Sequence, residues 1–364
     1  MAYKKTAVIL AAGRRNSGMY SVDSAAAAYF KDSGLEYRLF AAQRHSADHG
    51  SVAGQTIHFL QSLEELDDYP QIVYWGDFLN NPAYGNGDFC NRDLRYGHSK
   101  NRAQAIERWA RLFTLKGDRK SRRAVSVGNN FQHDFSAKAG TYAPGLRRLE
   151  DRFTAILPRD RHSFQNLSRS FSYAGMAKIM PGLDCAFLLP PVRQEKRATF
   201  CYFFGRSGFS QPAEMVRMLE AKTGLRGINL GHWLRLDDRR SEAQFQEFRS
   251  EIAAAQFVLT DTYHLCINSF TLKTPVIGLG KCAARQTGTL GDFKKRTLFE
   301  MIAMEQSYFE QDSSAETETE FYGRVLRDCT LDPGSGFFED ARFSLMQALT
   351  ARFRHRLDRL LLAA

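Results

Sequence analysis

The segment TDTYHLCINSF, residues 260–270, combines side chains suited to acid–base chemistry with a buried setting. It follows the apolar run AAAQFVL and precedes TPVIGLG, and both runs predict buried strands. His264 can donate or accept a proton near neutral pH, and Asp261 stands where it could orient the imidazole. An isolated histidine in an apolar setting often only completes a core. Its place after a strand favours function, so we take His264 and Asp261 as the candidate catalytic residues.

A second polar segment, GRSG, follows the strand predicted in ATFCYFF. Its glycines let backbone N–H groups approach an anion, and the next helix adds positive potential at its N-terminus. An ordinary turn with a solvated arginine is equally compatible with this pattern. The candidate donor-binding residues are Gly205, Arg206, Ser207 and Gly208, together with Thr262, Tyr263, Asn268 and Lys281.

The N-terminal half also has polar residues directly after its predicted strands. A doubly wound parallel sheet binds ligands at the carboxyl ends of its strands, so these positions favour substrate binding. The candidate acceptor-binding residues are Asn16, Gly18, Asp77, Asn80, Asn129 and Asn130.

The elements that must position these residues follow a βα rhythm, in which short apolar runs alternate with amphipathic segments. The double proline that ends GLDCAFLLPP predicts a stiff link between two such halves. We therefore predict an α/β protein with two Rossmann-like domains facing across a cleft (GT-B-like). Residues 1–190 would form the acceptor side and residues 191–340 the donor side, and residues 341–364 an amphipathic helix packed on the N-terminal domain. The acidic segment 310–320 predicts a mobile connector.

Composition restricts the class of protein further. The chain has 364 residues, of which 43% are hydrophobic, and a formal net charge of +10, which favours an anionic partner. Its six cysteines include no C-x-x-C pair, so we expect neither a metal site nor a structural cofactor. No apolar run reaches membrane-spanning length, which favours a cytoplasmic protein.

The order of several motifs resembles that of the polysaccharide pyruvyl transferase family over most of the chain. The motifs are RRNSGMYSVDSA, IVYWGDFL, PRDRHSFQNL, GLDCAFLL and FVLTDTYHLCINSFTLKTPVIGLG. The resemblance implies a GT-B-like architecture and transfer of a pyruvyl group from phosphoenolpyruvate to a sugar of a glycan or lipid-linked saccharide. It also implies that His264 assists as general acid. The expected partners are an anionic donor and a saccharide acceptor, with peripheral association at the inner membrane face.

The sequence departs from that family at one position of chemical consequence. Thr262 stands where the family usually has an arginine, and Tyr263 replaces an aliphatic residue. Arg206 or Lys281 could substitute for the missing guanidinium in space. Two alternatives stay open: a GT-B glycosyltransferase that uses a nucleotide-sugar donor, and a non-catalytic protein that binds nucleic acid through its basic surface. Nucleic acid is the less expected partner, and the sequence sets no oligomeric state.

Overall fold

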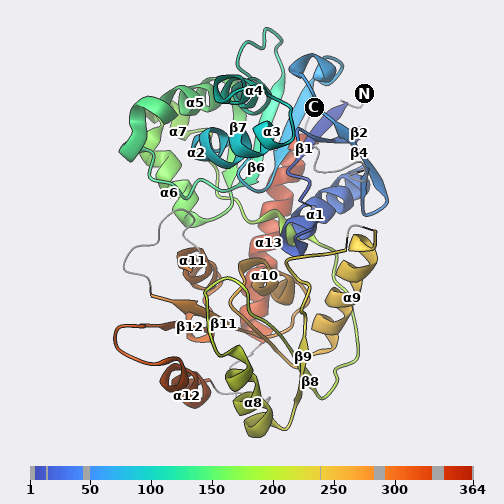
Figure 1. Ribbon diagram of the computed structural model, residues 1–364. Helices are drawn as coiled ribbons and strands as arrows, with labels where there is room; N and C mark the ends of the chain where they lie inside the picture. Colours follow the sequence, from blue (N-terminus) through green and yellow to red (C-terminus); the bar gives the residue numbers. More distant parts are fainter. Residues whose placement is uncertain are drawn as a thin grey trace. The chain divides into compact units, whose positions relative to one another are not determined.

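The computed structural model describes residues 5–13, 15–43, 50–237, 239–282, 292–329 and 340–362. These residues form two units, each built on its own sheet (Figure 1). Unit 1 takes its residues from Met1–Arg14, Met19–Leu189 and Arg352–Ala364. Unit 2 takes its residues from Pro190–Ala351 and also includes the short segment Arg15–Gly18.

The sheet of unit 1 is parallel except at one edge. Its strand order is β3 (Ser51–Val52), β4 (Gln55–Phe59), β2 (Tyr37–Ala41), β1 (Thr6–Leu10), β5 (Gln71–Trp75), β6 (Arg123–Asn129) and β7 (Phe153–Pro158). Only the β3–β4 pair is antiparallel among the described strands of this sheet. The chain winds outward from β1 to β2 and β4, and then returns to β5 on the other side of β1. This reversal makes the β1–β5 junction the switch point where such sheets bind ligands.

Helices cover both faces of the unit 1 sheet. One face packs against α4 (Arg102–Thr114), α5 (Ala139–Arg152) and α6 (Arg161–Ser170). On the other face lie α1 (Ser17–Ser33) and the last turns of α13 (Asp340–Leu361), as the ring contact of Tyr29 with Trp75 and a Gln71–Leu361 hydrogen bond indicate. Shorter helical segments are Leu63–Leu66, α2 (Pro82–Tyr84), a π-helical turn Gly85–Phe89, α3 (Cys90–Arg95), Ser136–Lys138, α7 (Tyr173–Met176) and Cys185–Leu188.

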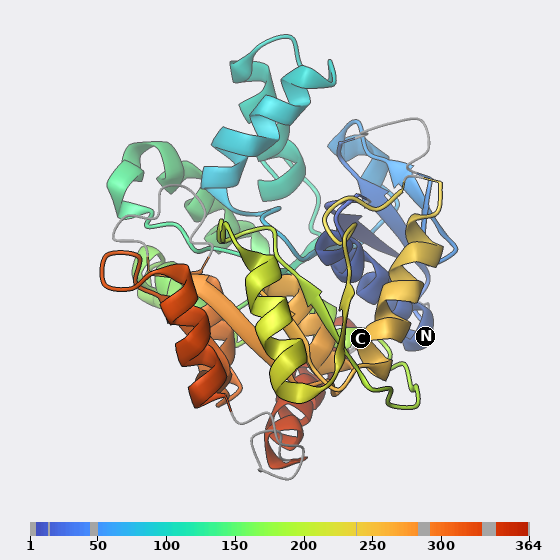
Figure 2. The same ribbon diagram turned by 60° about the horizontal axis from the view of Figure 1, so that its bottom comes forward.

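Unit 2 has a parallel sheet in the order β12 (Tyr308–Gln311), β11 (Val276–Lys281), β10 (Val258–Thr260), β8 (Thr199–Phe203) and β9 (Arg226–Asn229). Figure 2 shows α8 (Pro212–Thr223) and α12 (Glu318–Asp328) side by side on one face, where their apolar residues join the core. The remaining helices are α9 (Ser241–Ala254), α10 (Tyr263–Thr271) and α11 (Phe293–Met301), with a short helical turn at Glu305–Ser307. Here the strand order reverses between β8 and β10.

The predicted α/β class is confirmed, since both units have the parallel sheets and crossover helices of Rossmann-like folds. The second half of α13 belongs to unit 1, where Phe353 and Leu357 are buried and Tyr29 donates a hydrogen bond to Asp358 at 2.8 Å, whereas the part of the helix up to Ala351 belongs to unit 2. Within the described part of the chain, no helix is both long and apolar enough to span a membrane.

Two local expectations differ from the structure. The sequence pattern did not indicate the β3–β4 hairpin, which is short and half-polar. The acidic segment 310–320 is not a mere connector, because Gln311 ends β12 and Thr317 begins α12 through a capping box with Glu320. Reciprocal hydrogen bonds of this kind start a helix even where apolar residues are few.

Candidate active site

The turn that carries His264 lies at the carboxyl end of β10, beside the switch point of the unit 2 sheet. Thr260 ties this turn to β8, because its hydroxyl donates to the Phe203 carbonyl at 2.8 Å and accepts from the Thr262 N–H at 3.0 Å. Thr262 immediately precedes α10, so His264 stands in the first turn of that helix, half-buried. These hydrogen bonds therefore fix the position of the turn that carries the imidazole.

Asp261 binds the loop that the sequence indicated as an anion site. Its carboxylate accepts hydrogen bonds from the backbone N–H groups of Gly205 (2.9 Å), Arg206 (2.9 Å) and Ser207 (2.7 Å). The Thr262 hydroxyl donates a fourth bond, at 3.1 Å. A carboxylate offers about four acceptor positions, so this one is filled.

This geometry changes the roles expected for both segments. The three N–H groups that were candidates for a donor phosphate bind a carboxylate of the chain itself. Asp261 holds the β8 and β10 loops together across the switch point. Its predicted role as the orienting partner of His264 stays a prediction that this geometry does not support.

A buried lysine, Lys295 of α11, completes this anchoring. Its ammonium donates to the Asp261 and Leu279 carbonyls, both at 2.6 Å, and lies 2.6 Å from a carboxylate oxygen of Asp292. The Ser207 hydroxyl joins the same network, because it donates to Asp292 at 2.7 Å and accepts from Lys295 at 2.9 Å. Only 1% of Lys295 is exposed, so its charge is compensated inside the protein. Nothing local in the sequence marked Lys295 or Asp292 as site residues.

Lys281, a candidate donor-binding cation, is engaged elsewhere. Its ammonium donates to the Gly208 carbonyl and to Glu318, both at 2.9 Å, and lies 4.9 Å from the centroid of the Phe209 ring. Glu318 also accepts from the Ser210 N–H group. Burial raises the pKa of Glu318, but the hydrogen bonds from Ser210 and Lys281 outweigh it and lower that pKa to about 2. Lys281 therefore closes the β8–α8 loop against α12.

The segment Arg15–Gly18 belongs to this site. The Ser17 N–H donates to the Trp233 carbonyl at 3.0 Å, and the Arg15 carbonyl accepts from Leu236 at 2.7 Å. A Cβ atom added to Gly18 would lie 2.5 Å from Nδ1 of His264, so only glycine lets this backbone approach the imidazole. Asn16 accepts from the Gly18 N–H at 2.9 Å and so caps α1.

The other candidate donor residues divide into buried and exposed groups. Tyr263 is buried, and its ring centroid is 5.1 Å from that of His264 at an interplanar angle of 81°. Asn268 is buried too and donates to the His264 carbonyl at 2.8 Å, which steadies the helix turn. The Arg206 side chain is exposed, and its guanidinium makes no hydrogen bond within the described residues.

The candidate acceptor residues Asn80, Asn129 and Asn130 are fully buried in unit 1. Asn129 accepts from the Asn80 N–H at 3.1 Å and donates to the Tyr74 carbonyl at 3.2 Å. Asn130 accepts from Gln132 at 2.8 Å. These amides hold together the loops after β5 and β6. Because they are buried, they would support acceptor binding by positioning these loops and not by contacting the acceptor.

Asp77 is half-buried at the switch point of unit 1, where its backbone has a φ of 54°. The buried carboxyl of Asp23, which sequence reasoning missed, accepts from the Gly13 N–H at 3.1 Å. Burial raises the pKa of Asp23 well above its usual value, and the negative charge of Asp77 adds to this. Two carboxyl groups therefore share this edge of the sheet.

Sequence reasoning also missed a cluster near the π-helical turn Gly85–Phe89. Arg92 donates to the Tyr84 hydroxyl and stacks over that ring, 5.1 Å from its centroid. His133 lies 3.0 Å from the Asn81 amide nitrogen, and burial lowers its pKa while Asp88 opposes this. A π-turn inserted in a helix often marks a functional position, and only the structure shows this one.

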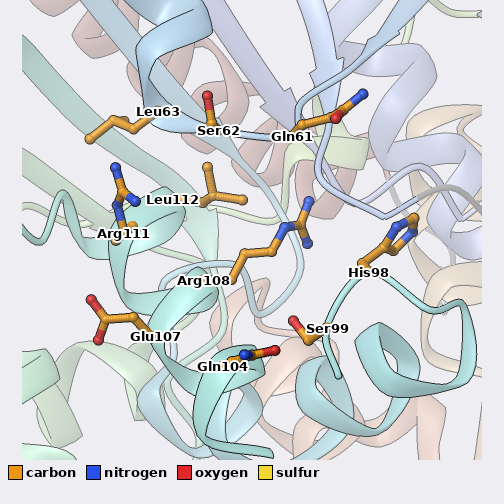
Figure 3. A pocket seen from close by; sticks show the side chains of 10 residues that line it. All are labelled: Gln61, Ser62, Leu63, His98, Ser99, Gln104, Glu107, Arg108, Arg111 and Leu112. Atoms are coloured by element: carbon orange, nitrogen blue, oxygen red, sulfur yellow. The ribbon is translucent and has the colours of Figure 1, made fainter. Parts of the chain in front are cut away.

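A cavity of about 300 Å³ opens in unit 1, beside the loop after β4 and along α4 (Figure 3). The guanidinium of its central side chain, Arg108, pairs with the Asp93 carboxylate at 2.6 Å and donates to the Ala42 and Leu60 carbonyls at 2.7 and 2.9 Å. Burial lowers the pKa of Arg108, and Asp93 counteracts this. None of the sequence-predicted site residues lines this cavity. Across the described residues, no group of three or more His, Cys, Asp or Glu side chains could hold a metal ion.

Solved structures show that the fold is GT-B-like. A UDP-GlcNAc 2-epimerase from Neisseria meningitidis, bound to UDP-GlcNAc, is similar with a TM-score of 0.55 at 10% identity, over 99% of this chain and 100% of that one. The corresponding epimerase of Methanocaldococcus jannaschii has a TM-score of 0.52 at 11% identity, over 99% and 100%. The calicheamicin glycosyltransferase CalG4 has a TM-score of 0.50 at 13% identity, over all of both chains. At these identities the likeness shows the fold alone.

A match of the sequence to a known protein family narrows the class of protein further. Residues 115–281 match the family described as Polysaccharide pyruvyl transferase, and this stretch includes the β10–α10 turn. This region is a little under half of the chain, and over it the predicted resemblance to this family is confirmed, which implies a transferase. No curated protein matches the chain.

Proposed function

We propose that this protein transfers the pyruvyl group of phosphoenolpyruvate to two hydroxyl groups of a saccharide, forming a ketal and releasing inorganic phosphate. The observation that carries the proposal is the position of His264, half-buried on a rigid turn within the matched family domain. Phosphoenolpyruvate is a co-substrate in this scheme, so no bound cofactor is required.

In the proposed reaction, His264 gives a proton to the methylene carbon of phosphoenolpyruvate, which becomes the ketal methyl group. The adjacent carbon then carries oxocarbenium character, and a first sugar hydroxyl forms a bond to it. A second hydroxyl attacks the same carbon as the carbon–oxygen bond to phosphate breaks. One hydroxyl proton restores His264, and the other leaves with phosphate, so atoms and charge balance. General acid catalysis of this kind contributes roughly a hundredfold to ten-thousandfold to a rate.

Unit 2 would bind the donor and unit 1 the saccharide. Support for the donor side is the convergence of His264, Gly18 and the Asp261-anchored loop in unit 2. Support for the acceptor side is the set of polar loops, with Asp77 and His133, at the carboxyl ends of the unit 1 strands. A lipid-linked acceptor would bring the protein to the inner membrane face. The alternative of a nucleotide-sugar glycosyltransferase has only the likeness of fold in its favour.

The test measures phosphate release by the purified full chain with phosphoenolpyruvate and a panel of saccharide acceptors. Phosphate release should require both substrates, and the product should gain the mass of a pyruvyl ketal. His264→Gln should abolish release without a change in thermal midpoint. His355→Gln, a matched change at an exposed histidine of α13, should leave release unaffected. If the chain instead consumes UDP-, GDP- or CMP-sugars and ignores phosphoenolpyruvate, the proposal is wrong.

A further inference from the structure

The cavity along α4 lies at the carboxyl ends of two strands of unit 1, β2 and β4. Arg108 donates to the carbonyls of Ala42 and Leu60, the residues that directly follow these strands. In Figure 3 its side chain extends from α4 toward the loop that carries Gln61. Open parallel sheets bind ligands at this edge, where the loops after β5 and β6 also lie. The volume, about 300 Å³, is at the lower end of the range for small-molecule sites.

The guanidinium and carboxylate groups that line the cavity each form an ion pair with a neighbouring side chain. The pairs are Arg108–Asp93, Arg111–Glu64 and Glu107–Lys116. Together these pairs carry no net charge. A ligand of either sign gains little from such a wall, so the cavity favours an uncharged polar molecule.

Two amide side chains of the wall keep hydrogen-bonding capacity for a ligand. Gln61 makes a hydrogen bond only through its backbone N–H within the described residues, so its amide can serve a ligand. The Gln104 side-chain carbonyl accepts from the Lys100 N–H at 3.0 Å, and its NH₂ group makes no hydrogen bond to the same part of the chain. An amide both donates and accepts, as a sugar hydroxyl does, so the two kinds of group are complementary.

The cavity also offers apolar and ring surface. Leu63 and Leu112 line it and are buried. The His98 ring lines it as well and lies against the Phe59 ring, with 5.0 Å between centroids and an interplanar angle of 37°. A pyranose presents C–H groups on its faces and hydroxyl groups around its edge. It therefore fits a wall that combines a ring and aliphatic side chains with a few amides.

Hydrogen bonds hold this wall in place without a ligand. Ser99 donates to Asp93 at 2.5 Å, and the same carboxylate binds Arg108 at 2.6 Å. Asn101 caps α4 by accepting from the Gln104 N–H at 3.0 Å. A preformed site has less conformational entropy to lose when a ligand binds.

We propose that this cavity binds one uncharged sugar unit of a saccharide, through the amides of Gln61 and Gln104 and against the His98 ring. None of the candidate catalytic or donor-binding residues lines the cavity, so the sugar bound here is not the one that receives the pyruvyl group. Only the identification of this saccharide with the acceptor of pyruvyl transfer rests on the proposed function. The cavity then selects acceptors of more than one sugar.

The test is calorimetric titration of the full chain with neutral di- and trisaccharides built from glucose, galactose, mannose and N-acetylhexosamines. At least one should bind, and Gln61→Leu and Gln104→Leu should each weaken that binding roughly fivefold, as the loss of one neutral hydrogen bond predicts. His98→Ala should weaken it too, whereas His98→Phe, which keeps a ring, should not. The matched control is Gln165→Leu, which removes an exposed amide from α6 of the same unit and should bind as the wild type does.

Steady-state kinetics separate this sugar from the reacting one. With a di- or trisaccharide that supports phosphate release, Gln104→Leu should raise the KM for the saccharide. It should leave kcat and the KM for phosphoenolpyruvate unchanged, because a contact remote from the reacting atoms is equally present in the ground and transition states.

Binding of none of these saccharides, or binding that the Gln61 and Gln104 variants retain in full, overturns the sugar site. Tighter binding of inorganic phosphate, abolished by Arg111→Gln, makes the cavity an anion site and overturns it as well. If saccharides bind through Gln104 but phosphoenolpyruvate is not consumed, the proposed function falls and the sugar site stands. If phosphoenolpyruvate is consumed and both glutamine variants behave as the wild type, the sugar site alone falls.

Discussion

Replacing Asp261 by asparagine decides between two roles for this carboxylate. If Asp261 holds the β8 and β10 loops together, Asp261→Asn should destabilise unit 2. If it orients His264, the variant should lose activity while its stability stays nearly unchanged. The structure favours the first outcome, because three backbone N–H groups and one hydroxyl already donate to this carboxylate.

The size of the effect follows from the four bonds. In its best orientation, the asparagine NH₂ replaces the oxygen that faces the Gly205 N–H and the Thr262 hydroxyl, and the hydroxyl can turn to accept. The Gly205 N–H then loses its acceptor, and the bonds from Arg206 and Ser207 become neutral. Hydrogen bonds to charged groups are worth about 1.5–3 kcal/mol and neutral ones about 1, so the expected loss is about 3 kcal/mol. For a cooperative domain the size of unit 2, this lowers the thermal midpoint by roughly 6–12 °C.

Differential scanning calorimetry of the full chain would measure this loss. The matched control is Asp312→Asn in the same unit, an exposed aspartate that accepts from the N–H and the hydroxyl of Ser314 through one oxygen. It should change the unfolding free energy by less than about 0.5 kcal/mol. A loss below about 1 kcal/mol for Asp261→Asn, together with lost activity and a displaced pH–rate profile, would refute the anchoring role.

Three further outcomes test other parts of the site. Gly18→Ala should lower activity about tenfold or more with a small loss of stability, because its Cβ would displace the His264 ring, whereas Gly231→Ala, with no atom nearer than 3.6 Å, should be silent in both assays. Because the pKa of Glu318 is lowered to about 2, its stabilising effect is complete above pH 4.5 and is lost as the pH falls toward 2. The free energy of unfolding should therefore fall between pH 6 and pH 3 by about 2 kcal/mol less in Glu318→Gln than in the wild type, as denaturation at the two pH values would measure. Asn129→Asp should destabilise unit 1 by about 3 kcal/mol in urea unfolding, since it turns a buried carboxylate toward the carbonyls that the amide now serves.

Much of the fold could be predicted because its signals are local. Strand β10 and the turn after it are legible in FVLTDTYH, where an apolar run ends in polar residues, and Gly34 ends α1 with a φ of 70° as glycine commonly does. The start of α1 is also set locally, because Asn16 caps the helix and Gly18 lies within its first turn. The β3–β4 hairpin escaped detection, since two-residue strands carry too little alternation to be recognised.

The site was predictable only in part, for a physical reason. The sequence by itself determined that His264 follows a strand, that glycines follow β8, and that no arginine stands at position 262, because strand ends and turns are set by neighbouring residues. Only the tertiary structure decided which charges meet. Asp261 binds the loop at 205–207 across the switch point, and Lys281 pairs with Glu318. Lys294 lies over the Tyr263 ring although it belongs to α11, which is separated from α10 by strand β11. A charge acts through whatever lies within a few ångströms of it, and those neighbours come from distant parts of the chain.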